Sequence, residues 1–127
     1  MDKAALVNMD VETGTKMLRA LDGADLKVRV ALWAQLPEYQ DWRLILSSKE
    51  FDRARLRDAY GRVSQALDAA GIPLEQIPPL LILSMTTPFV RTLRKIFGKA
   101  KSVEGMRLGG QMIGDRFLED GYVYRIS

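Results

Sequence analysis

Hydrophobic positions in the first third of the chain follow two different periods. Between residues 10 and 22 they recur at helical spacing, and Gly23 is a typical helix stop. From residue 28 to residue 36 they alternate with other residues, and they do so again over residues 42–47, after a turn that begins at Pro37. This pattern predicts a helix followed by a β-hairpin.

A second helical stripe follows the hairpin. It covers residues 56–70, and Gly71 ends it. Its start lies between Ser47, which fits a capping box, and Asp52, which is the simpler N-cap. We expect one long helix here, packed on the sheet through Tyr60.

A buried strand and a third helix are predicted next. Residues 80–85 form a continuous apolar run after a loop rich in proline, which favours a central strand. Thr87 is then suited to cap a helix and Pro88 to occupy its first position, while Gly98 is suited to end it.

The last part of the chain predicts a second hairpin. Residues 106–113 and 116–126 flank a two-residue turn, Gly114-Asp115, and we expect Gly109-Gly110 to mark a bulge. Alternation assigns the large residues of the return strand to two faces. One face would carry Leu118, Tyr122, Tyr124 and Ile126, and the other Phe117, Glu119, Val123 and Arg125.

The predicted order of elements is α-β-β-α-β-α-β-β. Helices interspersed with hairpins are typical of the α+β class, here a single mixed, largely antiparallel five-stranded sheet with three packed helices. The 127 residues suit one domain, residues 1–127, and leave little room for a second core.

The composition excludes several kinds of chemistry. The chain contains no cysteine and no histidine, so thiolate, zinc-finger and imidazole-based catalysis are ruled out. Asp115, Glu119 and Asp120 are the densest acids, but Glu119 and Asp120 are adjacent on a strand and would point to opposite faces. We therefore expect no cofactor and no metal. With no leader or membrane span visible in the sequence, we expect a cytoplasmic protein that does not enter a membrane.

The net charge of +3 is modest, but its distribution is uneven. Residues 88–107 hold one acid, Glu104, and six bases, which are Arg91, Arg94, Lys95, Lys99, Lys101 and Arg107. Such a segment is suited to an acidic partner, either nucleic acid or an acidic protein. Phe89 and Phe97 stand at helical spacing and are expected in the core, which leaves no platform for base stacking.

The junction of the predicted strand and the third helix is the most site-like feature. It brings hydroxyl groups to a helix start, where free amides attract anions. A phosphate would be held by Thr86, Thr87, Arg91, Arg94 and Lys95. The simpler interpretation is that Thr87 caps the helix and that the basic side chains are solvated.

Association of two copies is the next expectation. Each hairpin has an apolar pair on its second face, Trp33 with Ile45 in the first and Phe117 with Val123 in the last. If no helix covers one of these faces, its apolar surface would favour self-association. Tyr122 and Tyr124 add large amphipathic surface to the last strand. We expect a homodimer that uses either this hairpin or the Trp33 face.

Two motifs carry a resemblance. Ala31-Leu32-Trp33 with Trp42-Arg43-Leu44, and the closing Glu119-Asp120-Gly121-Tyr122-Val123-Tyr124-Arg125, resemble a set of small, uncharacterised bacterial proteins. The likeness covers most of the chain. It implies a bacterial origin and brings no activity or site residues.

The sequence thus predicts a homodimeric, non-catalytic binding module. Its residues 88–107 would contact nucleic acid or an acidic protein. One alternative is an enzyme that acts on a phosphorylated or nucleotide substrate at Thr86 and Thr87. A pocket at that junction would favour the enzyme, and an open basic surface the binding module. A structural subunit of a larger assembly is the other alternative.

Overall fold

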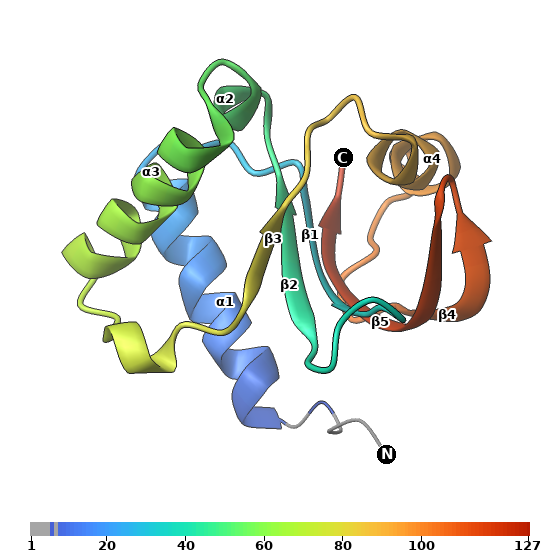
Figure 1. Ribbon diagram of the computed structural model, residues 1–127, viewed down its shortest axis with the longest axis horizontal. Coiled ribbons are helices and arrows are strands. Elements are labelled where there is room, and N and C mark those ends of the chain that lie inside the picture. The colour runs from blue at the N-terminus through green and yellow to red at the C-terminus, as the bar shows by residue number, and fades with distance from the viewer. Residues whose placement is uncertain (1–5, 7) are drawn as a thin grey trace.

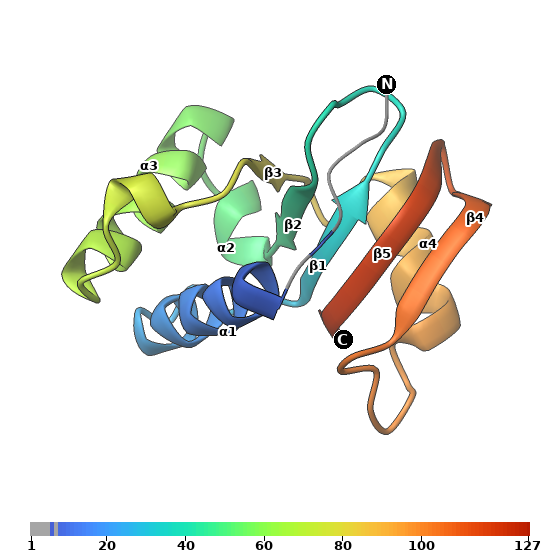
Figure 2. The same cartoon turned by 90° about the horizontal axis from the view of Figure 1, so that it is seen from below.

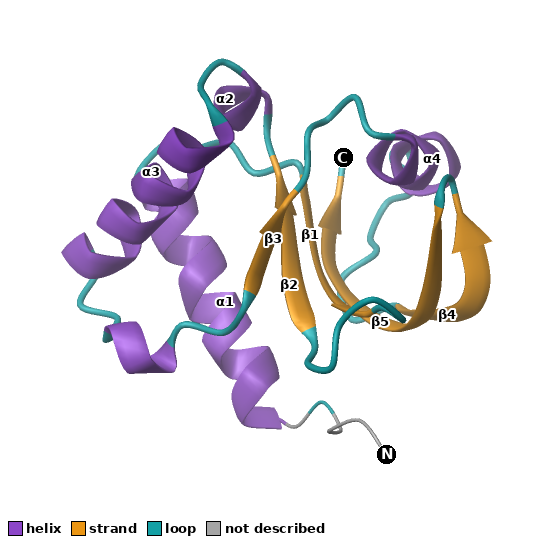
Figure 3. Ribbon diagram, viewed as in Figure 1, coloured by secondary structure: helices purple, strands orange, loops and turns teal. Residues whose placement is uncertain are grey.

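The computed structural model describes residue 6 and residues 8–127. Its elements, in chain order, are α1 (Asn8–Gly23), β1 (Val30–Gln35), β2 (Arg43–Ser47), α2 (Lys49–Asp52), α3 (Leu56–Ala69), the 3-10 helix η1 (Leu74–Gln76), β3 (Leu80–Ile82), α4 (Pro88–Phe97), β4 (Arg107–Ile113) and β5 (Arg116–Ile126). Figures 1 and 3 show this arrangement. The predicted α+β class is confirmed, and α2 adds a short helix to the predicted order.

The five strands form one mixed sheet in the order β3-β2-β1-β5-β4. β2 and β3 are parallel, and the other three neighbouring pairs are antiparallel. The mixed, largely antiparallel sheet predicted from the sequence is therefore confirmed. β1 is the central strand, between β2 and β5. The prediction of a central strand over residues 80–85 is wrong, because β3 covers only Leu80–Ile82 and lies at an edge of the sheet.

Helices cover both faces of this sheet. α1, α2 and α3 lie on one face and α4 lies on the other, as Figures 1 and 2 show from two directions. The first core joins α1 and α3 to the sheet through Met17, Leu21, Val63, Leu67, Trp33, Leu44 and Leu46. The second core joins α4 to the other face through Phe89, Val90, Leu93, Leu32, Ile45, Val123 and Ile126.

Trp33 and Ile45 lie on opposite faces, so the prediction that they share one is wrong. Trp33 is paired with Leu44 and packs beneath α1 and α3, whereas Ile45 is paired with Leu32 and packs beneath α4. Alternation fixes the faces within each strand, but the register between two strands depends on the turn that joins them. The sequence pattern alone did not determine that register.

The faces of β5 also differ from the prediction, because its alternation is interrupted. The register with β1 shifts between Ala31 and Leu32, so Tyr124 is an extra residue in β5. Such a bulge moves the residues that follow it to the other face. Val123 and Ile126 consequently both pack beneath α4, while Tyr124 packs in the core on the opposite face.

The far part of the last hairpin carries a second irregularity. Gly110 has a φ of +69°, a conformation that favours glycine, but the pairing of β4 with β5 shows no inserted residue. The expected bulge at Gly109-Gly110 is therefore a kink. Beyond it, Phe117 is 40% exposed and does not share a covered face with the buried Val123.

The predicted long helix is in fact two helices, α2 and α3. Ser48 caps α2 by accepting a hydrogen bond from the Glu50 amide, so neither Ser47 nor Asp52 is the N-cap. Arg55 then adopts an extended conformation (φ −67°, ψ 152°) and separates the two helices. Tyr60 of α3 does pack on the sheet, since its hydroxyl accepts a hydrogen bond from the amide of Ile82.

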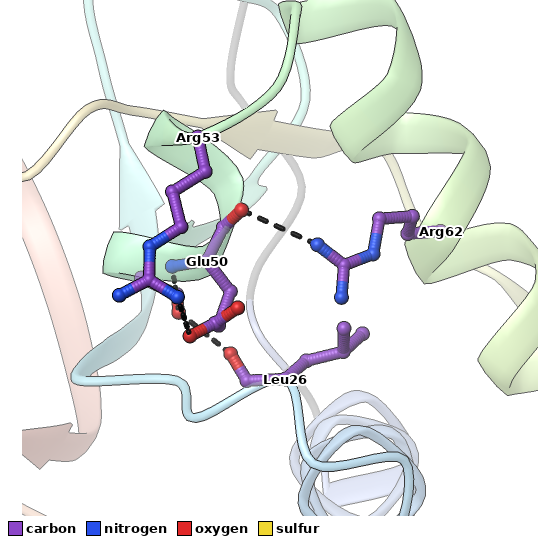
Figure 4. A network of polar contacts seen from close by, with 5 residues as sticks. Leu26, Glu50, Arg53 and Arg62 are labelled. Carbon is purple, nitrogen blue, oxygen red and sulfur yellow. Dashed lines mark hydrogen bonds and ion pairs between the residues drawn. The ribbon is translucent and has the colours of Figure 1, made fainter.

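A polar network joins α2 to α3 and to the loop after α1 (Figure 4). The Ser48 hydroxyl donates to the Leu26 carbonyl at 2.6 Å, and Arg62 of α3 donates to the Glu50 carbonyl at 3.3 Å. Arg53 forms an ion pair with the Glu50 carboxylate at 3.0 Å. These contacts connect the loop after α1 to both helices that follow β2.

Glycine at position 14 allows α1 to pass close to β5. A Cβ added to Gly14 would lie 2.7 Å from the Tyr124 Cζ, whereas one added to Gly61 of α3 would meet nothing within 4 Å. We predict that Gly61→Ala stabilises the fold by about 0.5–1 kcal/mol through helix propensity. Gly14→Ala should destabilise it by about 1–3 kcal/mol through overpacking. Urea denaturation midpoints measure both, and equal gains for the two variants would contradict the close approach.

Candidate functional site

The segment between β3 and α4 is a tight turn closed by its own hydroxyl groups. The Ser84 hydroxyl lies 2.8 Å from the Thr86 hydroxyl and accepts a hydrogen bond from the Thr86 amide. The Thr87 hydroxyl donates to the Ser84 carbonyl at 2.8 Å. Asp52 of α2 accepts a hydrogen bond from the Met85 amide at 3.0 Å. The hydroxyls that the sequence offered as phosphate ligands thus hold the turn together.

The start of α4 is packed against another loop. Thr87 is the N-cap by backbone position and Pro88 comes first in the helix, as predicted, but the Thr87 side chain makes no capping bond. Gly114, in the turn between β4 and β5, lies so close that an added Cβ would be 2.7 Å from the Phe89 nitrogen. The turn after β4 therefore packs on the first residues of α4, while Thr86 and Pro88 remain exposed.

The outer face of α4 carries two basic residues in one place. Arg91 and Lys95, four residues apart and so on the same side of the helix, line an open depression together with Pro88 and Thr92. Both basic side chains are exposed. Neither forms an ion pair with any residue that the structure describes.

Two of the predicted bases are engaged within the chain. The Arg94 Nε donates to the Ser127 oxygen at 2.8 Å, which connects α4 to the residue after β5. Arg107 forms an ion pair with Asp120 across the last hairpin at 2.7 Å. The predicted roles of Arg94 in anion binding and of Arg107 in partner contact therefore compete with internal bonds.

The remaining two bases, Lys99 and Lys101, are exposed in the loop after α4. They too have no ion pair within residue 6 and residues 8–127. We call Arg91, Lys95, Lys99 and Lys101 the α4 basic group. It is what remains of the six predicted bases once the internally bonded ones are set aside.

The aromatic residues predicted at a dimer interface lie largely inside the chain. Trp33 is 2% exposed and Tyr124 8% exposed. The Trp33 Nε1 donates to the Tyr124 hydroxyl at 2.9 Å, and that hydroxyl donates to the Val11 carbonyl of α1 at 2.6 Å. Tyr122 is half-buried, with its ring edge-on to that of Tyr124. Trp33 and Tyr124 are thus core residues, and their prediction as contact residues is wrong.

An ion pair that the sequence did not predict lies near Tyr124. Arg125 binds both carboxylate oxygens of Asp22, at 2.9 and 2.8 Å, and also donates to the Val28 carbonyl. The hydrogen bond to Asp22 raises the pKa of Arg125. The pair lines a small depression with Arg19 and Glu104. Its two members are 103 residues apart in the chain, so no local pattern could have indicated it.

In the described part of the chain, no three side chains of metal-ligating type come together. The helices of this part are all too short or too polar to cross a bilayer.

Comparison of the chain with known protein families, with curated proteins and with solved structures gives no match. The resemblance of the two hairpin motifs to small bacterial proteins stays a prediction. Any function must accordingly be argued from the contacts of this chain.

The buried tyrosine predicts a loss of stability at high pH. Burial raises the pKa of Tyr124 from 10.0 to about 12, so the unfolded chain loses this proton at a lower pH than the folded one. The protonated Tyr124 therefore contributes fully to the free energy of unfolding below pH 10. This contribution is lost as the pH rises toward 12, which lowers the free energy of unfolding by on the order of 2 kcal/mol. Denaturation at several pH values should show a smaller fall for Tyr124→Phe. An equal fall would contradict this origin.

Proposed function

We propose that this protein is a non-catalytic binding module whose α4 basic group contacts an acidic partner. One observation carries the proposal: Arg91 and Lys95 line the same open depression, and neither is neutralised by a described residue. Basic side chains left in this state attract anionic groups over a distance of roughly 8 Å at physiological ionic strength.

The neighbouring residues favour an acidic protein over nucleic acid as the partner. Ile96, on the outer side of α4, is 61% exposed, and a protein surface can cover an apolar side chain while its carboxylates meet the bases. Single-stranded nucleic acid is held by base stacking on aromatic rings. The aromatic residues of α4 are unsuited to this, because Phe89 is buried and Phe97 is packed against the core.

The contacts at the strand–helix junction do not favour the enzyme alternative. Thr86 and Thr87 are bonded to Ser84, and the depression on α4 is lined by neither of them. No carboxylate lines that depression beside Arg91 and Lys95, so the Thr92 hydroxyl there has no general base to activate it. A binding role needs only the exposed charges.

Charge reversal tests the proposal. Arg91→Glu with Lys95→Glu should abolish binding to poly-glutamate, used as an acidic polypeptide probe, because repulsion replaces attraction at both positions. The thermal midpoint should change little, since both side chains are exposed. Lys16→Glu with Arg19→Glu is the matched control: it makes the same charge change on α1, in the opposite layer, and should leave most of the binding.

The outcomes separate the possible partners. Equal loss of binding in the two double variants would mean that only net charge matters, and would refute a site on α4. Binding to a single-stranded oligonucleotide that exceeds binding to poly-glutamate, with a steep decrease as salt rises, would replace the acidic protein by nucleic acid. Binding to neither probe by the parent protein would refute the proposal.

A further inference from the structure

The two edges of the sheet are protected to different degrees. At one edge, β3 is only three residues long, and Pro78 and Pro79 precede it. The Tyr60 hydroxyl accepts a hydrogen bond from the Ile82 amide at 3.0 Å, so a side chain takes up a backbone group of this strand. Short strands, prolines and capped backbone groups are the usual means by which an edge avoids pairing with another chain.

The other edge, β4, has few of these protections. It is seven residues long, five of its residues are exposed, and no strand among the described residues pairs with its outer side. Its one charged residue, Arg107, is already bonded to Asp120. Arg107 therefore deters pairing less than a free charge would.

An apolar pair accompanies this open edge. Met112 of β4 stands directly opposite Phe117 of β5, and the two side chains are 61% and 40% exposed. Neither belongs to the core beneath α4. Figure 2 shows that α4 lies behind this hairpin and that no helix lies in front of it.

We propose that β4 pairs antiparallel with β4 of a second copy of this chain, with Gln111 on the two-fold axis. This register pairs residues 109–113 of the two copies and brings Arg107 to the turn at the end of the other copy's β4. Asp115 in that turn is exposed and has no ion pair with a described residue. The register also places Met112 opposite Gly110, which has no side chain to obstruct it. Opposite charges and complementary sizes across an antiparallel pair both stabilise it.

Antiparallel pairing at an edge has a geometric consequence. The two-fold axis is perpendicular to the sheet, so each face of one copy continues into the same face of the other. Both α4 helices then lie on one side of the joined sheet, and both sets of α1–α3 on the other. The dimer does not depend on the proposed binding function, although it would bring two α4 basic groups to the same face.

A single cysteine on the axis tests the register directly. Because the chain contains no cysteine, Gln111→Cys introduces the only thiol, and pairing across the axis brings two Cβ atoms about 4.5–5.5 Å apart. Mild oxidation should then crosslink most of the protein into a dimer. Gln65→Cys, exposed on α3, is the control and should remain a single chain of 14.3 kDa. Failure of Gln111→Cys to crosslink beyond the control would overturn this register.

Light scattering at micromolar concentration tests the dimer without a crosslink. The parent protein should have twice the mass of one chain, 14.3 kDa. Met112→Lys should reduce the mass to one chain, and Ile96→Lys, at a residue that is equally exposed at 61%, should not. A single-chain mass for the parent overturns the proposal, as does a dimer that survives Met112→Lys or is lost in Ile96→Lys.

Discussion

The burial of β1 between two layers of helices is the constraint on which the rest of the structure depends. Five successive residues of this strand, from Val30 to Ala34, are buried, so any polar atom among them needs a partner inside the protein. The indole nitrogen of Trp33 donates a hydrogen bond to the Tyr124 hydroxyl, and that hydroxyl donates to the Val11 carbonyl of α1. Gly14 is the residue that lets α1 come close enough for this contact.

The same constraint shapes the last hairpin. β5 must supply Tyr124 to the core beneath α1 while Val123 and Ile126 fill the core beneath α4, and regular alternation cannot satisfy all three. The bulge opposite Ala31 and Leu32 resolves this conflict. The hairpin then extends along α4 until its turn, at Gly114, packs on the start of that helix. The predicted start of α4 is therefore in contact with this turn, a contact that the sequence did not indicate.

Much of the fold could be predicted from the sequence, because its elements are encoded locally. The alternation around Pro37 predicted the first hairpin, and Thr87-Pro88 predicted where α4 begins. Register and pairing were not predictable in the same way: the turn decides that Trp33 meets Leu44, and a bulge decides where Tyr124 points. The candidate site was predicted in outline only. The local density of basic residues identified Arg91 and Lys95. It could not show that Arg94 bonds to Ser127 and Arg107 to Asp120, because these partners lie outside the basic segment.

The position of β1 has a consequence for how the protein is made. Its second neighbour, β5, follows it only after β2, β3 and β4, and the pairing of Val30 with Ile126 joins residues that are far apart in the sequence. During synthesis β1 and β2 are made well before β5, so the central strand stays unpaired on one side until residues 116–126 have been added. Contacts between such distant segments slow folding and prolong the exposure of strand edges. The sheet can therefore close only after β5 has been made, and until then one edge of β1 is open to pairing with other chains.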